Sequence, residues 1–432
     1  MPTTTTLAEM LGTLLKRRPG RGRAEDRRPL PELCRALLSD MDEPARLRCA
    51  AAILARYQGL DGAGRLEFFS HVDREFDIDA AGLAELAGRY AADPSAQAYA
   101  ALIRAADTPR RRFFRRLNEA PGATAELVRM RADLIGLLPR HPELARTDID
   151  LADLLRGWFN RGFLVLRRIT WDSPASLLEK IIAYEAVHEI RSWDDLRRRL
   201  NPADRRLFAF FHPAMPDEPL IFVEVALTRG VPGSIDALLT EAPAGEAEDA
   251  DTAVFYAISN CQPGLKGVSF GNFLIKQVAE ELGKELPGLR NFVTLSPVPG
   301  LVAWLEARGL KALAEQDEEA LRRLAAHYLL VERDQRGRPL DPVARFHLGN
   351  GASVDGLHLN ADTSESGLAR SLGVMVNYRY EPDRIAENLA LLARGQEVAA
   401  VGALRSLARQ AEKLIPARPA ITAESGAEAP QG

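Results

Sequence analysis

Along the first half of the chain, apolar side chains recur at intervals of three and four residues, the spacing that gathers them on one face of an α-helix. The pattern is clear in EPARLRCAAAILARYQGL (43–60), AAGLAELAGRYAA (80–92) and DIDLADLLRGWFNRGFLVLRRI (148–169). Alternating, strand-like patterns are scarce before about residue 200. We therefore predict a helical bundle over residues 26–200.

The pattern changes near Asn201, where short aromatic and β-branched runs begin. RRLFAFFH (205–212) and PLIFVEVAL (219–227) flank a Pro-rich, turn-like segment, which predicts a β-hairpin. We expect a long loop at 343–364. Elsewhere predicted strands alternate with predicted helices, the strands at 253–258, 291–295 and 374–380 and the helices at 301–309, 318–330 and 383–394. This alternation predicts an α+β or α/β domain over residues 201–415.

The two ends of the chain have a different composition. Residues 1–25 are rich in Thr and Arg and are expected to form a flexible basic arm, with a mitochondrial transit peptide as the alternative. Residues 416–432 are small, polar and Pro-bearing, which is typical of a disordered tail.

Composition narrows the classes of molecule that the protein is expected to bind. The net charge of −4 argues against a dedicated nucleic-acid binder, and no apolar run reaches the roughly 20 residues of a membrane span. PRRRFFRRL (109–117) resembles a nucleic-acid patch, but on an amphipathic helix it predicts a solvated or intersubunit basic face. Three well-separated cysteines and no His or Cys cluster indicate a reducing cytoplasm and no metal site.

A glycine-bearing loop follows the predicted strand at 253–258. Gly264, Gly267 and Gly271 permit close backbone approach, and the free N–H groups at the start of the next helix favour an anion such as a phosphate. The loop is neither a Walker A motif nor a dinucleotide-binding fingerprint. By its glycines alone, a plain helix-entry turn explains it equally well.

Three polar residues are candidates for chemistry. Ser296 lies where a predicted strand ends, although it also fits a cap for the following helix. His347 lies in a Gly- and Asn-rich stretch and titrates near neutral pH unless perturbed, although a lone histidine is more often structural. Tyr380 ends a strand in NYRYEPDR, where a stabilising tyrosine pair is the alternative.

Several segments together resemble malonyl-CoA decarboxylase, over about residues 40–395. They are FFHPAMPDEPLIFVEVALT, AISNCQPGLKGVSFGNFLIKQV, TLSPVPGLVAWL, ARFHLGNGA and GVMVNYRY, in matching order and spacing. The resemblance implies a helical domain followed by a Gcn5-related acetyltransferase-like (GNAT) catalytic domain. It also implies a homo-oligomer such as a tetramer, assembled through the helical domain.

The resemblance assigns roles within the second domain. Ser296, His347 and Tyr380 correspond to the family's catalytic serine, histidine and active-site tyrosine. The pyrophosphate of coenzyme A is expected at the loop formed by Lys266, Gly267, Val268, Ser269, Phe270, Gly271 and Asn272. Many relatives carry a glutamate at the position of Ser269, so the need for that carboxylate is in doubt here.

The implied reaction converts malonyl-CoA to acetyl-CoA and CO2 through an enolate, which requires no metal or organic cofactor. It needs donors aimed at the thioester oxygen and a proton source for the carbon. His347 would polarise the oxygen or supply the proton. Two alternatives are an acyl-CoA-dependent acyltransferase and a non-catalytic acyl-CoA sensor. Selectivity against methylmalonyl-CoA stays open.

Overall fold

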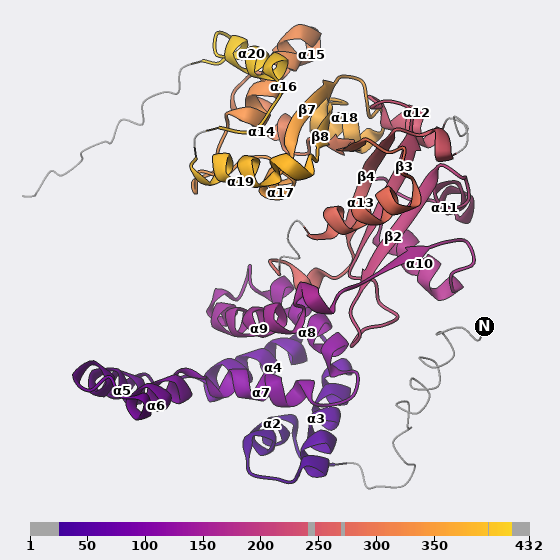
Figure 1. The fold of residues 1–432 in the computed structure, drawn as a ribbon. Helices are drawn as coiled ribbons and strands as arrows, with labels where there is room; N and C mark the ends of the chain where they lie inside the picture. Colours follow the sequence, from indigo (N-terminus) through magenta and orange to yellow (C-terminus); the bar gives the residue numbers. More distant parts are fainter. Residues whose placement is uncertain (1–25, 241–246, 269–272, 396, 417–432) are drawn as a thin grey trace, which may run out of the picture. The chain divides into compact units, whose positions relative to one another are not determined.

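The structure, a computed structural model, describes residues 26–240, 247–268, 273–395 and 397–416. The chain forms two compact units, Met1–Gly157 and Trp158–Gly432 (Figure 1). The division therefore lies about 40 residues before the boundary near residue 200 that the hydrophobic pattern predicts. Within the described residues, no helix is both long and apolar enough to cross a membrane.

The first unit is helical, as predicted. Aspartate, serine or threonine side chains cap several helix starts; Asp42, Asp61 and Thr108, for example, accept hydrogen bonds from backbone N–H groups of the first turn. The helices are α2 (Leu30–Leu38), α3 (Glu43–Gln58), α4 (Gly62–Glu75), α5 (Ala80–Ala92), α6 (Ala96–Ala106), α7 (Pro109–Asn118), η1 (Pro142–Leu144), α8 (Ala123–Leu137) and α9 (Ala145–Trp158).

The basic run on α7 is solvated only in part: Arg112 and Arg115 are exposed, as predicted, whereas other arginines of the run point into the unit. Arg110 is buried and bonds to the carboxylates of Asp73 and Asp150 within the unit. Arg116 bonds to the carbonyls of Leu37 and Ser39. Arg110 and Arg116 therefore each have acceptors within the helical unit and are not left unpaired.

The second unit is built on one mixed sheet. Its strand order is β1-β2-β3-β4-β5-β8-β6, and β7 pairs with β8. The strands are β1 (Val165–Ile169), β2 (Arg205–Phe211), β3 (Ile221–Thr228), β4 (Thr252–Asn260), β5 (Asn291–Thr294), β6 (Ser296–Pro297), β7 (Ser353–His358) and β8 (Met375–Arg379). The predicted hairpin is confirmed, since β2 and β3 pair in antiparallel register around the Pro-rich turn.

Helices and short 3-10 turns connect these strands. They are η2 (Arg161–Phe163), α10 (Ala175–Tyr184), α11 (Trp193–Leu200), α12 (Ile235–Thr240), η3 (Ala247–Asp249), η4 (Pro263–Leu265), α13 (Phe273–Glu285), α14 (Leu301–Ala307), α15 (Lys311–Gln316), α16 (Glu318–Leu330), α17 (Pro342–Gly349), α18 (Glu365–Ser371), η5 (Pro382–Arg384), α19 (Ile385–Ala393) and α20 (Gly402–Ala411).

Two local predictions are wrong. Val165–Ile169 is strand β1 and not helix, because its residues pair along β2 from Val165↔Phe211 to Ile169↔Leu207. The stretch predicted as a long loop contains α17 and β7. There, Asp341 caps the helix and a turn at Asn350 and Gly351 follows it, so the loop-like composition marks only the end of the helix.

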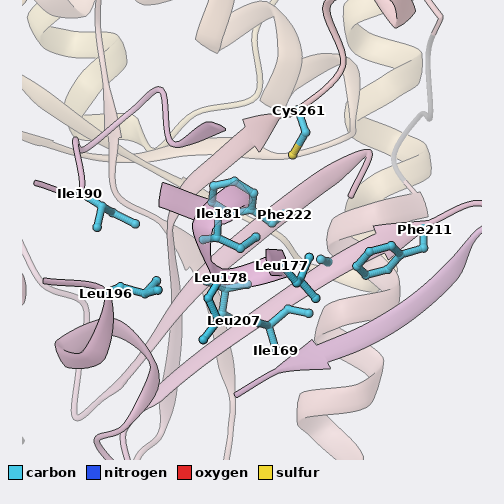
Figure 2. Close-up of a cluster of buried hydrophobic side chains, with 11 residues drawn as sticks. Ile169, Leu177, Leu178, Ile181, Ile190, Leu196, Leu207, Phe211, Phe222 and Cys261 are labelled. Atoms are coloured by element: carbon cyan, nitrogen blue, oxygen red, sulfur yellow. The ribbon is translucent and has the colours of Figure 1, made fainter. Parts of the chain in front are cut away.

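A hydrophobic cluster joins α10 and α11 to one face of the sheet (Figure 2). Leu177, Leu178 and Ile181 of α10 pack against Leu207 and Phe222 of strands β2 and β3. Burial of these side chains removes apolar area from water and stabilises the packing of α10 and α11 on strands β1, β2 and β3.

Strand β4 is irregular and pairs with β5 over only part of its length. It runs parallel to β5 only from Thr252↔Asn291 to Phe255↔Thr294. Its antiparallel register with β3 shifts between Glu224 and Val225, which makes Tyr256 the extra residue of a β-bulge. Bulges bend the strand that carries them. Beyond Phe255, β4 remains paired with β3 as far as Asn260, whereas its contacts with β5 end at Thr294 and at the hydrogen bond from Leu295 to Phe255.

Candidate active site

Ser296 lies where strand β5 is interrupted. The β5 ladder to β8 is recorded at Val293↔Arg379, and pairing resumes at Ser296↔Val376. Between them, the backbone N–H of Leu295 donates to the carbonyl of Phe255 on β4. The serine is only 6% exposed, and its hydroxyl is hydrogen-bonded to the hydroxyl of Thr294, with 2.9 Å between the oxygens.

His347 faces this serine from α17. The side chain of Asp341 accepts from the backbone N–H groups of Val343 and Ala344, which fixes the start of the helix. Nε2 of His347 lies 3.2 Å from Oγ of Ser296. His347 therefore stands near the C-terminal end of a short helix, and its prediction as a loop residue is wrong.

Tyr380 completes the arrangement from the end of β8. Its hydroxyl lies 2.8 Å from Nδ1 of His347, and its backbone N–H donates to the carbonyl of Phe292. Tyr378 stacks on the imidazole, with 4.6 Å between ring centroids and 22° between ring planes. The imidazole is thus held by a hydrogen bond at each nitrogen and by a ring on one face.

Burial sets the charge states of His347 and Tyr380. Removal from water lowers the pKa of His347 from 6.5 to about 3. Burial also raises the pKa of the Tyr380 hydroxyl well above its usual value. Both side chains are therefore neutral near pH 7, and the site is an uncharged chain of hydrogen-bonding groups.

The predicted anion loop is described in part. Lys266, Gly267 and Val268 follow η4, and Gly267 has a φ of +79°, in the left-handed region that favours glycine. The remaining predicted loop residues, Ser269 to Asn272, lie outside the described residues. The left-handed φ explains why glycine occupies position 267, and the sequence pattern had already indicated a need for glycine in this loop.

The structure brings together Ser296, His347 and Tyr380, three residues that are far apart in sequence. Sequence reasoning missed Thr294 and left Tyr378 without a role. Each precedes a predicted site residue by two positions on or beside a strand, and alternate strand residues share a face. That two-residue spacing is the only signal in the sequence by which they could have been found. Among the described residues, no group of three His, Cys, Asp or Glu side chains forms a metal site.

Comparison with known proteins identifies the family. A model described as the malonyl-CoA decarboxylase C-terminal domain matches residues 162–319 and 306–417, and the corresponding N-terminal domain model matches residues 76–159. The two models meet close to the division between the two structural units at Gly157.

Curated relatives and solved structures agree with these models. The mitochondrial malonyl-CoA decarboxylase of Anser anser anser is 37% identical, over 80% of this chain and 80% of its own. The malonyl-CoA decarboxylase of Rhodopseudomonas palustris is 46% identical and superposes with a TM-score of 0.82, covering 89% of this chain and 100% of its own. That of Cupriavidus metallidurans is 38% identical with a TM-score of 0.70, covering 88% and 98%. The chain therefore belongs to the malonyl-CoA decarboxylase family, as the sequence resemblance predicted.

Proposed function

We propose that this protein decarboxylates malonyl-CoA to acetyl-CoA and CO2 at the site formed by Ser296, His347 and Tyr380. The observation that carries the proposal is the continuous hydrogen-bonded contact between these side chains, 3.2 Å from serine to imidazole and 2.8 Å from imidazole to phenol. Membership of the decarboxylase family supports the choice of reaction.

We further infer that the second unit has a GNAT-type fold and that acyl-CoA lies where β4 and β5 separate. Ser296 lies on the β5 side of this opening, two residues beyond the last β4–β5 pair. The loop from Lys266 to Asn272 follows β4 and precedes α13, so the N–H groups at that helix start can meet the pyrophosphate. The thioester then lies near Ser296.

The reaction requires the bond between the α-carbon and the carboxylate carbon to break. Its electron pair moves toward the thioester carbonyl and gives an enolate, while the carboxylate leaves as CO2. A proton then adds to the α-carbon to form the acetyl group. Hydrogen-bond donors aimed at the thioester oxygen stabilise the charge that develops there.

The neutral site suits this chemistry. Because the pKa of His347 is lowered to about 3, the imidazole meets the substrate as an uncharged group that accepts at one nitrogen and donates at the other. The substrate carboxylate would raise that pKa when bound, which favours proton transfer during the reaction. Ser296 and Tyr380 would hydrogen-bond the carboxylate or the enolate oxygen.

Incubation with malonyl-CoA alone tests the proposed reaction. A decarboxylase forms acetyl-CoA and CO2 in equal amounts without any acceptor. An acyltransferase forms little product until a nucleophile is added, and a sensor binds the thioester without product. Absence of acetyl-CoA from folded protein that binds malonyl-CoA would overturn the proposal. Methylmalonyl-CoA in the same assay measures selectivity.

We also infer that the protein is a homo-oligomer, with a tetramer as the predicted form, assembled through the helical unit. Helices α5 and α6 form a hairpin that extends from the other helices of that unit and contains no buried residue (Figure 1). It exposes Tyr99 and Ile103 by about half. Sedimentation of wild type and a Tyr99→Glu/Ile103→Glu variant tests this.

Cytoplasmic location stays a prediction, since relatives are named as mitochondrial.

A further inference from the structure

Thr294 contacts the proposed site from beneath Ser296. Its side chain is fully buried, and its hydroxyl has two hydrogen-bond partners among the described residues. One is the Ser296 hydroxyl at 2.9 Å. The other is the backbone N–H of Tyr378, 3.1 Å away, which meets the threonine side chain where the β5–β8 ladder is interrupted. Asn377 holds the carbonyl of Thr294 through a 2.8 Å bond from its amide nitrogen.

These contacts constrain the direction of the hydrogen bonds. Either hydroxyl of the Ser296–Thr294 pair can donate to the other. The N–H of Tyr378, however, can only donate, so it occupies one lone pair of the threonine oxygen. Within the described residues, the Ser296 oxygen is then the only acceptor for the threonine's own proton. If Ser296 donated instead, the threonine proton would be buried without an acceptor, which is costly.

We propose that Thr294 is a positioning residue that fixes the direction of the hydrogen-bond chain through the active site. In the substrate-free protein, Thr294 donates to Ser296, Ser296 donates to Nε2 of His347, and Nδ1–H of His347 donates to the oxygen of Tyr380. The proton of Tyr380 is then left for the substrate. Thr294 is 0% exposed, so the open donor lies at the opposite end of the chain from the fully buried threonine.

This inference rests on the proposed function, because its consequence for turnover requires that the serine, histidine and tyrosine carry the reaction. The protonation state that it predicts for His347 can nevertheless be measured independently of the reaction. It states that the resting imidazole carries its proton on Nδ1 and has a bare Nε2. The reverse chain would place the proton on Nε2 and turn the tyrosine proton inward, away from the substrate.

Nitrogen NMR of the full protein labelled with ¹⁵N-histidine measures this state directly. We expect the two ring nitrogens of His347, assigned by their loss in His347→Asn, to show the Nδ1–H tautomer near pH 7. Thr294→Val removes the proton that enforces the direction, so the Nε2–H form should appear. Thr294→Ser keeps the hydroxyl and should restore the wild-type spectrum.

Turnover supplies the second readout. We expect Thr294→Val to lower kcat by roughly 10-fold, the effect of one lost hydrogen bond, with little change in CoA affinity. Thr294→Ser should recover the rate. Thr252→Val is the matched control: Thr252 is also fully buried, but lies on β4 and bonds to Asp251 and Asn291. It should leave the tautomer unchanged.

An Nε2–H tautomer in the wild-type spectrum would overturn the inference without any variant. So would wild-type kcat in folded Thr294→Val. Failure of the proposed function looks different: wild type would form no acetyl-CoA, or Ser296→Ala and His347→Asn would keep its turnover, while the wild-type spectrum still showed the Nδ1–H tautomer.

Discussion

Acidification should lower the free energy of unfolding through His347, by an amount that follows from its pKa. Burial lowers its pKa to about 3, whereas the unfolded chain has the ordinary value of 6.5. As pH falls below 6.5, the unfolded state takes up a proton that the folded state refuses, so stability declines with falling pH down to about 3. At pH 5, roughly 1.5 units below the unfolded value, the loss from this group is about 2 kcal/mol.

Replacing His347 isolates its contribution to the pH dependence of stability. His347→Asn has no group that titrates between pH 5 and 7, so it should lose about 2 kcal/mol less than wild type over this interval. Urea unfolding at pH 7, 6 and 5 measures both proteins. Other buried histidines with lowered pKa values, such as His188 and His212, contribute equally to each. Parallel pH dependences for wild type and variant would refute the reasoning.

Three further predictions follow from described contacts. Ser296→Ala should lower turnover by about 10²–10³-fold, as for a lost oxyanion donor; Ser371→Ala, another buried serine, should not, and equal rates in all three proteins would make Ser296 structural. Gly267→Val, at a φ of +79°, should weaken CoA binding in calorimetry, and unchanged affinity would remove the loop from the site. Arg199→Met removes the ion-pair partner of the fully buried Glu224, whose pKa burial already raises to about 7, so the variant should lose about 3–5 kcal/mol in denaturant unfolding at ~pH 8, where the wild-type carboxyl is ionised; a loss below about 1 kcal/mol would contradict the importance of this pair.

Hydrophobic patterning predicted the parts of the fold that depend on local sequence. The β2–β3 hairpin, strands β4 and β8 and several helices of the first unit, such as α3 and α5, were anticipated, because apolar runs or a helical spacing of apolar residues mark each of them. Helices α4 and α6 were not predicted. Strand β1 was missed for the opposite reason. Its residues are mostly exposed or half-buried, so they show no clear alternation, and only pairing with β2 makes them a strand.

The site itself was less accessible to sequence reasoning. Ser296 and Tyr380 were found through strand ends and family resemblance, but no pattern indicates that both meet His347. That contact depends on the break in β5, which aims the serine, and on the Asp341 cap, which sets the start of α17. Thr294 was missed because its importance lies in filling a gap in the ladder, a property of the folded sheet alone.

The central claim is that His347 is a chemical participant in malonyl-CoA decarboxylation. Its most direct test is the rate of acetyl-CoA formation from malonyl-CoA alone by His347→Ala and wild type, each shown to be folded and to bind CoA. A loss of about 10²–10⁴-fold with nearly unchanged CoA affinity is predicted, because the residue acts on the reacting atoms and the CoA portion supplies most of the binding. Turnover near that of wild type would contradict the claim and make His347 a structural residue.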